Sequence, residues 1–288
     1  MPKYLKVFCQ IVLSAVAVYW VSVKVDWTEL GRLYQTLNAG YIGLSVGALL
    51  VSRCIAALRL HLFFSEVGLR LPHWLNIQLY YLGLFYNLCL PGGISGDAYK
   101  IYWLQKHFDV RVKDLLHATL ADRLSGLLAL IWLFLLVFIS LDGLSSHLLV
   151  WLSYVGVWSM WPLAYAMQGI VSQRFKSVFF ASNIQAVLLQ LTQIIAVVWL
   201  LYSLNVSGPV GAYVCVFLLS SIVSVLPLSV GGVGAREFTF VYLQPWFGYD
   251  LATGVALSTL FFIINLLVSL PGIFCVNLNP ALKDKVLI

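Results

Sequence analysis

Long runs of apolar residues constrain the fold of this chain more than any other feature of its sequence. Several runs reach or exceed the roughly 20 residues that an α-helix needs to cross about 30 Å of hydrocarbon. Only 10% of the 288 residues are charged and 61% are hydrophobic, whereas a soluble globular domain has about 25% charged residues. The sequence therefore predicts an all-α, polytopic integral membrane protein.

Six apolar runs predict complete membrane spans, at residues 4–23, 40–64, 115–140, 148–168, 183–204 and 251–276. The first run also resembles a signal peptide. Its length of about 17 apolar residues and the spans that follow favour an uncleaved first helix.

Two further apolar stretches, residues 74–99 and 211–246, are each interrupted by a cluster of proline and glycine. The interrupting residues are Pro91, Gly92, Gly93 and Gly96 in the first stretch, and Pro227, Gly231, Gly232 and Gly234 in the second. Since proline removes a backbone donor and glycine favours non-helical dihedral angles, each stretch is predicted to form two half-helices. Irregular backbone at membrane depth is tolerated only where protein buries it or where it lines a watery cavity. We therefore expect the two clusters at the working centre.

Basic residues indicate the orientation of the chain. If both interrupted stretches are re-entrant hairpins, the basic residues of the termini, of segment 100–113 and of link 174–176 fall on one side. The positive-inside rule then predicts that both termini are cytoplasmic, in the cell (inner) membrane. The alternative is eight spans, in which both stretches cross fully and segment 100–113 faces outward.

The two interrupted stretches also suggest an internal repeat. Their Leu-Pro pairs begin at residues 90 and 226, a separation of 136 residues, close to half the chain. This spacing suggests repeat halves at residues 1–140 and 148–288 with inverted topology, as in many secondary transporters. Chance placement of two Pro/Gly clusters is the alternative.

Ionisable residues inside the predicted spans indicate a polar site, because a charge at the bilayer centre costs about 2.5 to 3.5 kcal/mol on insertion scales. Arg53 and Arg59 lie in the second span. We predict that an anionic group such as a phosphate is bound by Arg59, Arg123 and Arg236, helped by half-helix N-termini. Three carboxylates are predicted to hold these arginines when the site is empty: Asp97, Asp122 and Glu237. One of the three is also predicted to accept a proton. The structural alternative is snorkelling of Arg59 and plain packing ion pairs.

Other classes of site find little support. The five cysteines and five histidines show no metal-ligand spacing, so no metal or other cofactor is expected. The net charge of +6 comes from basic residues scattered over short loops, and nucleic acid is not an expected partner. No sequence-local catalytic constellation is visible.

Three ordered motifs carry a resemblance to a known family. They are NLCLPGGISGDAYK at residues 87–100, DRL at 122–124 and LPLSVGGVGARE at 226–237, and LRL at 58–60 also fits. Together they resemble the lysylphosphatidylglycerol synthase transmembrane family, also called flippase-like proteins. The resemblance implies a lipid flippase-type module. Two departures matter: Lys100, a further headgroup-binding candidate, stands where relatives often have arginine, and the chain ends about eleven residues after its last predicted span. The aminoacyl-transferase activity of the family's bacterial enzymes is therefore not expected.

These observations together predict a membrane transporter that moves an anionic lipid or lipid-linked headgroup between leaflets. The expected substrates are anionic phospholipids or polyprenyl-phosphate-linked sugars. The alternatives are a membrane-embedded lipid-modifying enzyme and an accessory subunit of an envelope glycan or lipid synthesis complex. The expected protein partner is a second copy of the chain or a protein of envelope synthesis.

Overall fold

A computed structural model of the chain describes residues 19, 21–89, 95–141, 147–171, 173–206, 208, 210–225 and 234–276. Over these residues it consists of helices joined by short links, with no strand. The α-helices are α2 (Trp27–Gln35), α3 (Ala39–Glu66), α4 (His73–Cys89), α5 (Ser95–His107), α6 (Val112–Ile139), α7 (His147–Val171), α8 (Phe179–Ser203), α9 (Val210–Val225), α10 (Ala235–Phe247) and α11 (Leu251–Ser269). Two 3₁₀ turns, η1 (Gln173–Phe175) and η2 (Leu270–Cys275), complete the order.

Five segments are long and apolar enough to span a membrane: Ala39–Glu66, Val112–Ile139, His147–Gln168, Phe179–Ser203 and Leu251–Cys275. Each coincides with a predicted span, and their ends differ from the predicted ends by a few residues. Most of the predicted first span, residues 4–23, lies outside the described residues. The all-α, multi-pass membrane architecture is therefore confirmed.

Both interrupted stretches form two helices, as predicted. The first gives α4 and α5 and the second gives α9 and α10, and the two helices of each pair pack together. Of the eight predicted helix-breaking residues, Gly96 and Gly234 are described and stand at the starts of α5 and α10. The other six, Pro91, Gly92, Gly93, Pro227, Gly231 and Gly232, lie outside the described residues. The prediction that the clusters form the working centre, and the choice between hairpins and full crossings, stay predictions.

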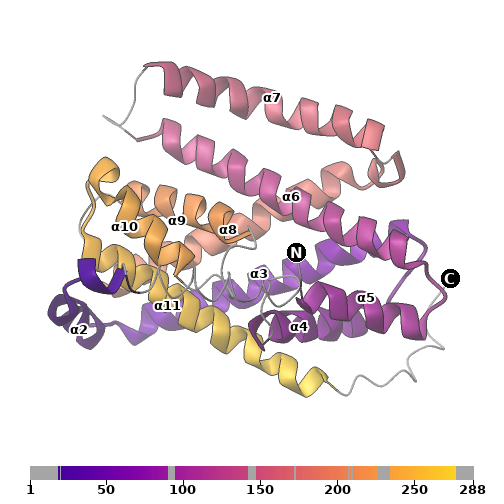
Figure 1. Cartoon of the computed structure of the whole chain (residues 1–288), viewed down its shortest axis with the longest axis horizontal. Coiled ribbons are helices and arrows are strands. Elements are labelled where there is room, and N and C mark those ends of the chain that lie inside the picture. The colour runs from indigo at the N-terminus through magenta and orange to yellow at the C-terminus, as the bar shows by residue number, and fades with distance from the viewer. Residues whose placement is uncertain are drawn as a thin grey trace.

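Helices α3 and α8 form an antiparallel pair with extensive contact along their length (Figure 1). Hydrogen bonds set their register along the whole length. The Ser203 hydroxyl bonds to the backbone of Asn38 at one end, the Gln193 amide donates to the Ser52 hydroxyl midway, and Ser177, just before α8, donates to Glu66 at the other end. This pair fixes the depth of the charged residues on α3.

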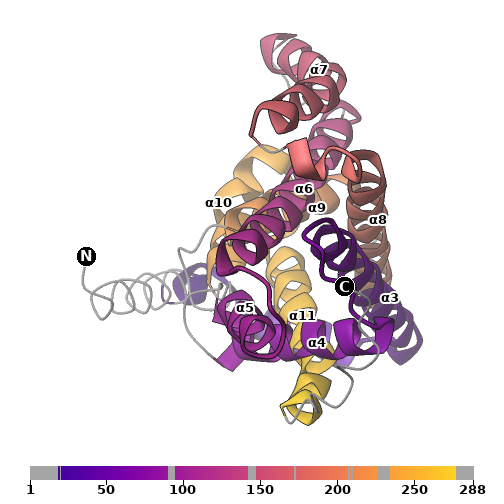
Figure 2. The same ribbon diagram turned by 90° about the vertical axis from the view of Figure 1, so that its right-hand side faces the viewer.

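The interrupted stretches form two groups of helices at opposite ends of the bundle. In Figure 1, α4 and α5 lie at one end of the bundle and α9 and α10 at the other, while α6 passes between them and α11 runs along the base. Helix α7 packs against α6 on the periphery, and Figure 2 shows it projecting from the bundle. The end of α3 at Glu66 lies beside Arg174 of η1, whose guanidinium also pairs with Asp114 of α6 at 3.4 Å. We call this the basic end of the bundle.

Candidate functional site

A buried ion pair joins two spanning helices near the basic end. The Nε of Arg59 on α3 donates to Oδ1 of Asp122 on α6 at 2.8 Å, and the Arg59 side chain is only 8% exposed. Arg59 lies seven residues before the end of α3, about 10 Å along the helix at 1.5 Å per residue. The pair therefore lies about two turns inside α3, and the Arg59 side chain is directed to a carboxylate of the neighbouring helix.

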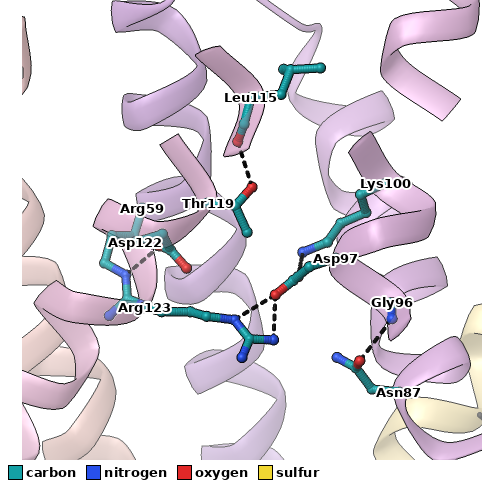
Figure 3. A network of polar contacts seen from close by, with 9 residues as sticks. All are labelled: Arg59, Asn87, Gly96, Asp97, Lys100, Leu115, Thr119, Asp122 and Arg123. Carbon is teal, nitrogen blue, oxygen red and sulfur yellow. Dashed lines mark hydrogen bonds and ion pairs between the residues drawn. The ribbon is translucent and has the colours of Figure 1, made fainter. Parts of the chain in front are cut away.

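A second carboxylate, Asp97, bridges two cations beside this pair (Figure 3). Its Oδ1 lies 2.6 Å from Nζ of Lys100, one turn further along α5. Its Oδ2 accepts hydrogen bonds from Nε and Nη2 of Arg123 on α6, at 2.6 and 2.5 Å. Because Asp122 and Arg123 are neighbours on α6, this helix links α3 to α5 through two adjacent side chains. We call the five residues, Arg59, Asp97, Lys100, Asp122 and Arg123, the ion-pair cluster.

Close backbone contact between α4 and α5 places Asp97. A Cβ on Gly96 would lie 1.9 Å from the carbonyl oxygen of Gly83 on α4, so only glycine permits this approach. The side chain of Asn87 accepts a hydrogen bond from the Gly96 amide at 2.8 Å, which satisfies a donor in the first turn of α5. Asp97 itself lies in that first turn, where a negative charge is favoured by the helix dipole.

The ion-pair cluster carries three cations and two carboxylates in a setting with little water. Its charges have the partners that buried charges need, since an ion moved into low dielectric without one pays several kcal/mol. Arg123 is the most exposed member, with 29% of its side chain accessible. Nη1 of Arg59 is buried and has no hydrogen-bond partner among the described residues. The cluster can therefore offer donors to an incoming anion.

Arg236 and Glu237 lie elsewhere. Helix α10, which carries them, is on the other side of the bundle from α5 (Figure 1). Glu237 accepts hydrogen bonds from the Gly234 amide at 2.9 Å and from the Ser258 hydroxyl at 2.8 Å, and so caps α10. Arg236 donates to the hydroxyl of Ser221 at 3.2 Å. The structure thus brings Arg59, Asp97, Lys100, Asp122 and Arg123 together and places Arg236 and Glu237 in a second group.

Arg53, which the sequence marks as a charge near the middle of a span, belongs to this second group. Its Nη2 donates to Oδ1 of Asn265 on α11. Sequence reasoning does not list Arg53 among the headgroup ligands. The available signal was Asn265, a polar side chain in an apolar run, which is uncommon unless it faces the protein interior.

No described group of three or more His, Cys, Asp or Glu side chains is arranged to hold a metal ion. The guanidinium and ammonium groups of the ion-pair cluster are instead suited to binding an anion.

A comparison with protein families identifies one match. Residues 7–272 match the family described as the lysylphosphatidylglycerol synthase TM region. The match spans four of the five membrane-crossing segments in full, most of the fifth, and both interrupted stretches. Among curated proteins, none matches the chain.

Proposed function

The chain belongs to the lysylphosphatidylglycerol synthase transmembrane family, and from this premise we propose that it moves an anionic lipid headgroup between the leaflets of its membrane. Family membership and the helical bundle indicate a multi-pass membrane protein of lipid metabolism or transport. Translocation is the finer function that the charged residues support best.

The observation that carries this proposal is the ion-pair cluster. Three cations from α3, α5 and α6 lie inside the apolar part of the bundle, which is costly unless the residues serve a purpose there. A phosphate oxygen offers the same charge and acceptor geometry as the carboxylate of Asp97. We infer that a headgroup phosphate replaces Asp97 on Arg123 and Lys100, while Asp97 holds both cations between transport cycles.

The acyl chains need no polar path. The lipid tails remain in hydrocarbon, and only the headgroup passes the cations, so the protein replaces the hydration that the phosphate loses. In this proposal the basic end faces the cytoplasm of the cell (inner) membrane, in line with the positive-inside rule.

Reconstitution tests the proposal. Purified full-length chain in liposomes is expected to carry acyl-labelled fluorescent phosphatidylglycerol across the bilayer, measured as loss of protection from dithionite, while mass spectrometry finds the lipid unchanged. Arg123→Gln removes two charge-assisted hydrogen bonds, and we expect the rate to fall about tenfold or more. Arg111→Gln is the matched control, because its side chain is 85% exposed at the basic end and lies outside the cluster.

Two results would contradict the proposal. One is the absence of movement for both phosphatidylglycerol and a polyprenyl-phosphate sugar with the natural chain. The other is an equal loss of rate in Arg123→Gln and Arg111→Gln, which would indicate a general charge effect.

A further inference from the structure

One face of α11 contacts the second group of charges at three successive levels. Ser258 donates to Glu237, the Phe261 ring lies 4.9 Å from the Arg236 guanidinium carbon, and Asn265 accepts from Arg53. These three residues of α11 are three and four positions apart, so they share a helix face. This face therefore contacts Arg236 and Arg53 at positions about one helical turn apart.

The two arginines differ from Arg59 and Arg123 in having no carboxylate partner among the described residues. Arg236 contacts the Ser221 hydroxyl and the faces of Phe217 and Phe261, at 5.4 and 4.9 Å. Arg53 contacts a neutral amide, and its buried Nε has no hydrogen-bond partner within the described structure. A cation–π contact contributes only about 0.5 to 2 kcal/mol, less than a buried charge requires. The two positive charges are therefore largely uncompensated.

The charge of this group is one positive unit. Arg53 and Arg236 contribute two positive charges, and Glu237, the neighbour of Arg236 in the sequence, contributes one negative charge. Helices α9 and α11 contain no Asp, Glu, Lys, Arg or His. The sequence 226–233 between α9 and α10 contains none either. One negative charge therefore neutralises the group.

We propose that Arg53 and Arg236, with Ser221 and Asn265, form a second headgroup site that is selective for a phosphodiester monoanion. We call it the mid-span station, because Arg53 is the fifteenth of the 28 residues of α3. This proposal rests on the proposed translocation of a lipid headgroup and specifies its substrate class. A phospholipid with one net negative charge and a polyprenyl monophosphate sugar both fit the class.

Charge matching excludes other headgroups. A dianion, such as a diphosphate-linked lipid, would leave one negative charge unpaired in a low-dielectric setting. A zwitterionic headgroup would bring its own cation beside two guanidinium groups, and like charges at close range repel. Only the monoanion gives a neutral, fully paired complex.

The substitution Asn265→Asp tests the station with little change of shape. The new carboxylate stands where an amide already contacts Arg53, so it forms an ion pair and, with Glu237 counted, brings the charge of the group to zero. We expect the affinity of the purified full-length chain for short-chain phosphatidylglycerol in detergent to fall about tenfold or more. The unfolding temperature is expected to hold or rise, which separates lost binding from misfolding. Repeating the measurement in an Arg123→Gln background weakens the ion-pair cluster and isolates the station.

Asn38→Asp is the matched control. It makes the same amide-to-carboxylate change at the N-cap of α3, where Asn38 accepts from the Gly40 amide. Aspartate caps helices as well as asparagine does, so neither stability nor affinity should change.

Three further ligands define the selectivity. Short-chain phosphatidylcholine, phosphatidic acid as its dianion, and water-soluble glycerophosphoglycerol should all bind more weakly than phosphatidylglycerol. An unchanged affinity in Asn265→Asp, or a dianion that binds more tightly, would overturn the station. If glycerophosphoglycerol binds as tightly as phosphatidylglycerol, the bound phosphodiester need not belong to a lipid, and a lipid ligand is refuted. If binding depends on Asn265 but no lipid moves in liposomes, the station stands and translocation is refuted.

Discussion

The contact between Gly96 and Gly83 makes Gly96→Ala the most sharply defined test of how the fold positions Asp97. The added methyl carbon would lie 1.9 Å from the Gly83 carbonyl oxygen and 2.7 Å from its carbon, whereas Cβ atoms essentially never approach below 3.0 Å. The two helices must therefore separate by roughly 1 Å, since 3.0 minus 1.9 is 1.1. Both contacting atoms are backbone, so no flexible side chain can yield. Overpacking of this kind typically costs about 1 to 3 kcal/mol, and this contact belongs at the upper end.

The same displacement affects the ion-pair cluster. Asp97 follows Gly96 directly, and its hydrogen bonds to Arg123 at 2.5 and 2.6 Å cannot survive a shift of about 1 Å unless Arg123 follows. We expect Gly96→Ala to lower the unfolding temperature in detergent and to reduce lipid transport in liposomes. Gly43→Ala on α3 is the control, because its Cβ would meet nothing within 4 Å, and alanine favours a helix over glycine by up to about 1 kcal/mol. Equal stability of the two variants would refute the close approach of α4 and α5.

Two further predictions follow from other contacts. Asp122→Asn leaves the Arg59 side chain, which is only 8% exposed, without its carboxylate partner, so we expect the free energy of unfolding to fall by about 3 kcal/mol or more. Adding Arg59→Gln should recover part of this loss, and no recovery would contradict the pairing. Asp26 accepts hydrogen bonds from the side chain and backbone of Thr28 and from the backbone of Glu29, and these bonds hold its pKa below the usual range. Its capping of α2 is therefore complete above about pH 4 and is lost as the pH falls through the folded-state pKa. In the natural chain, hydrogen exchange of the α2 amides should therefore rise at acidic pH relative to the intrinsic exchange rate. No such rise is expected in Asp26→Asn, where the cap is uncharged. An equal rise in both proteins would refute the capping role of the Asp26 carboxylate.

The spans were predictable because their signal is local. Twenty consecutive apolar residues determine a membrane helix without reference to any partner, and the ends of α3, α6 and α11 agree with the sequence to within a few residues. The breaks after α4 and α9 were predictable for the same reason, since proline and glycine act on their own backbone.

The grouping of the charges was not predictable, because it depends on helix phase and on packing between distant segments. Arg53 and Arg59 are six residues apart, which at 3.6 residues per turn directs them about 120° apart around α3. One faces Asp122 on α6 and the other Asn265 on α11. A single site containing Arg59, Arg123 and Arg236 would require α6 and α10 to meet the same face of α3, and no sequence pattern reports that.

The division of cations into a paired and an unpaired group bears on how a headgroup could pass through the bundle. Transport requires that each site bind the headgroup well enough to admit it and weakly enough to release it. In the ion-pair cluster, Asp97 and Asp122 compete with the phosphate and lower its net affinity. In the described part of the chain, the carboxylate that belongs to the mid-span group is Glu237, and it is already bound to Gly234 and Ser258. The phosphate should therefore be held more tightly at mid-span, where the cost of leaving water is greatest, and more loosely near the basic end, where water is close. This difference in pairing would flatten the energy profile across the bilayer, and it accounts for direct ion pairs at the level of Arg59 and Arg123 and their absence from the described contacts of Arg53 and Arg236.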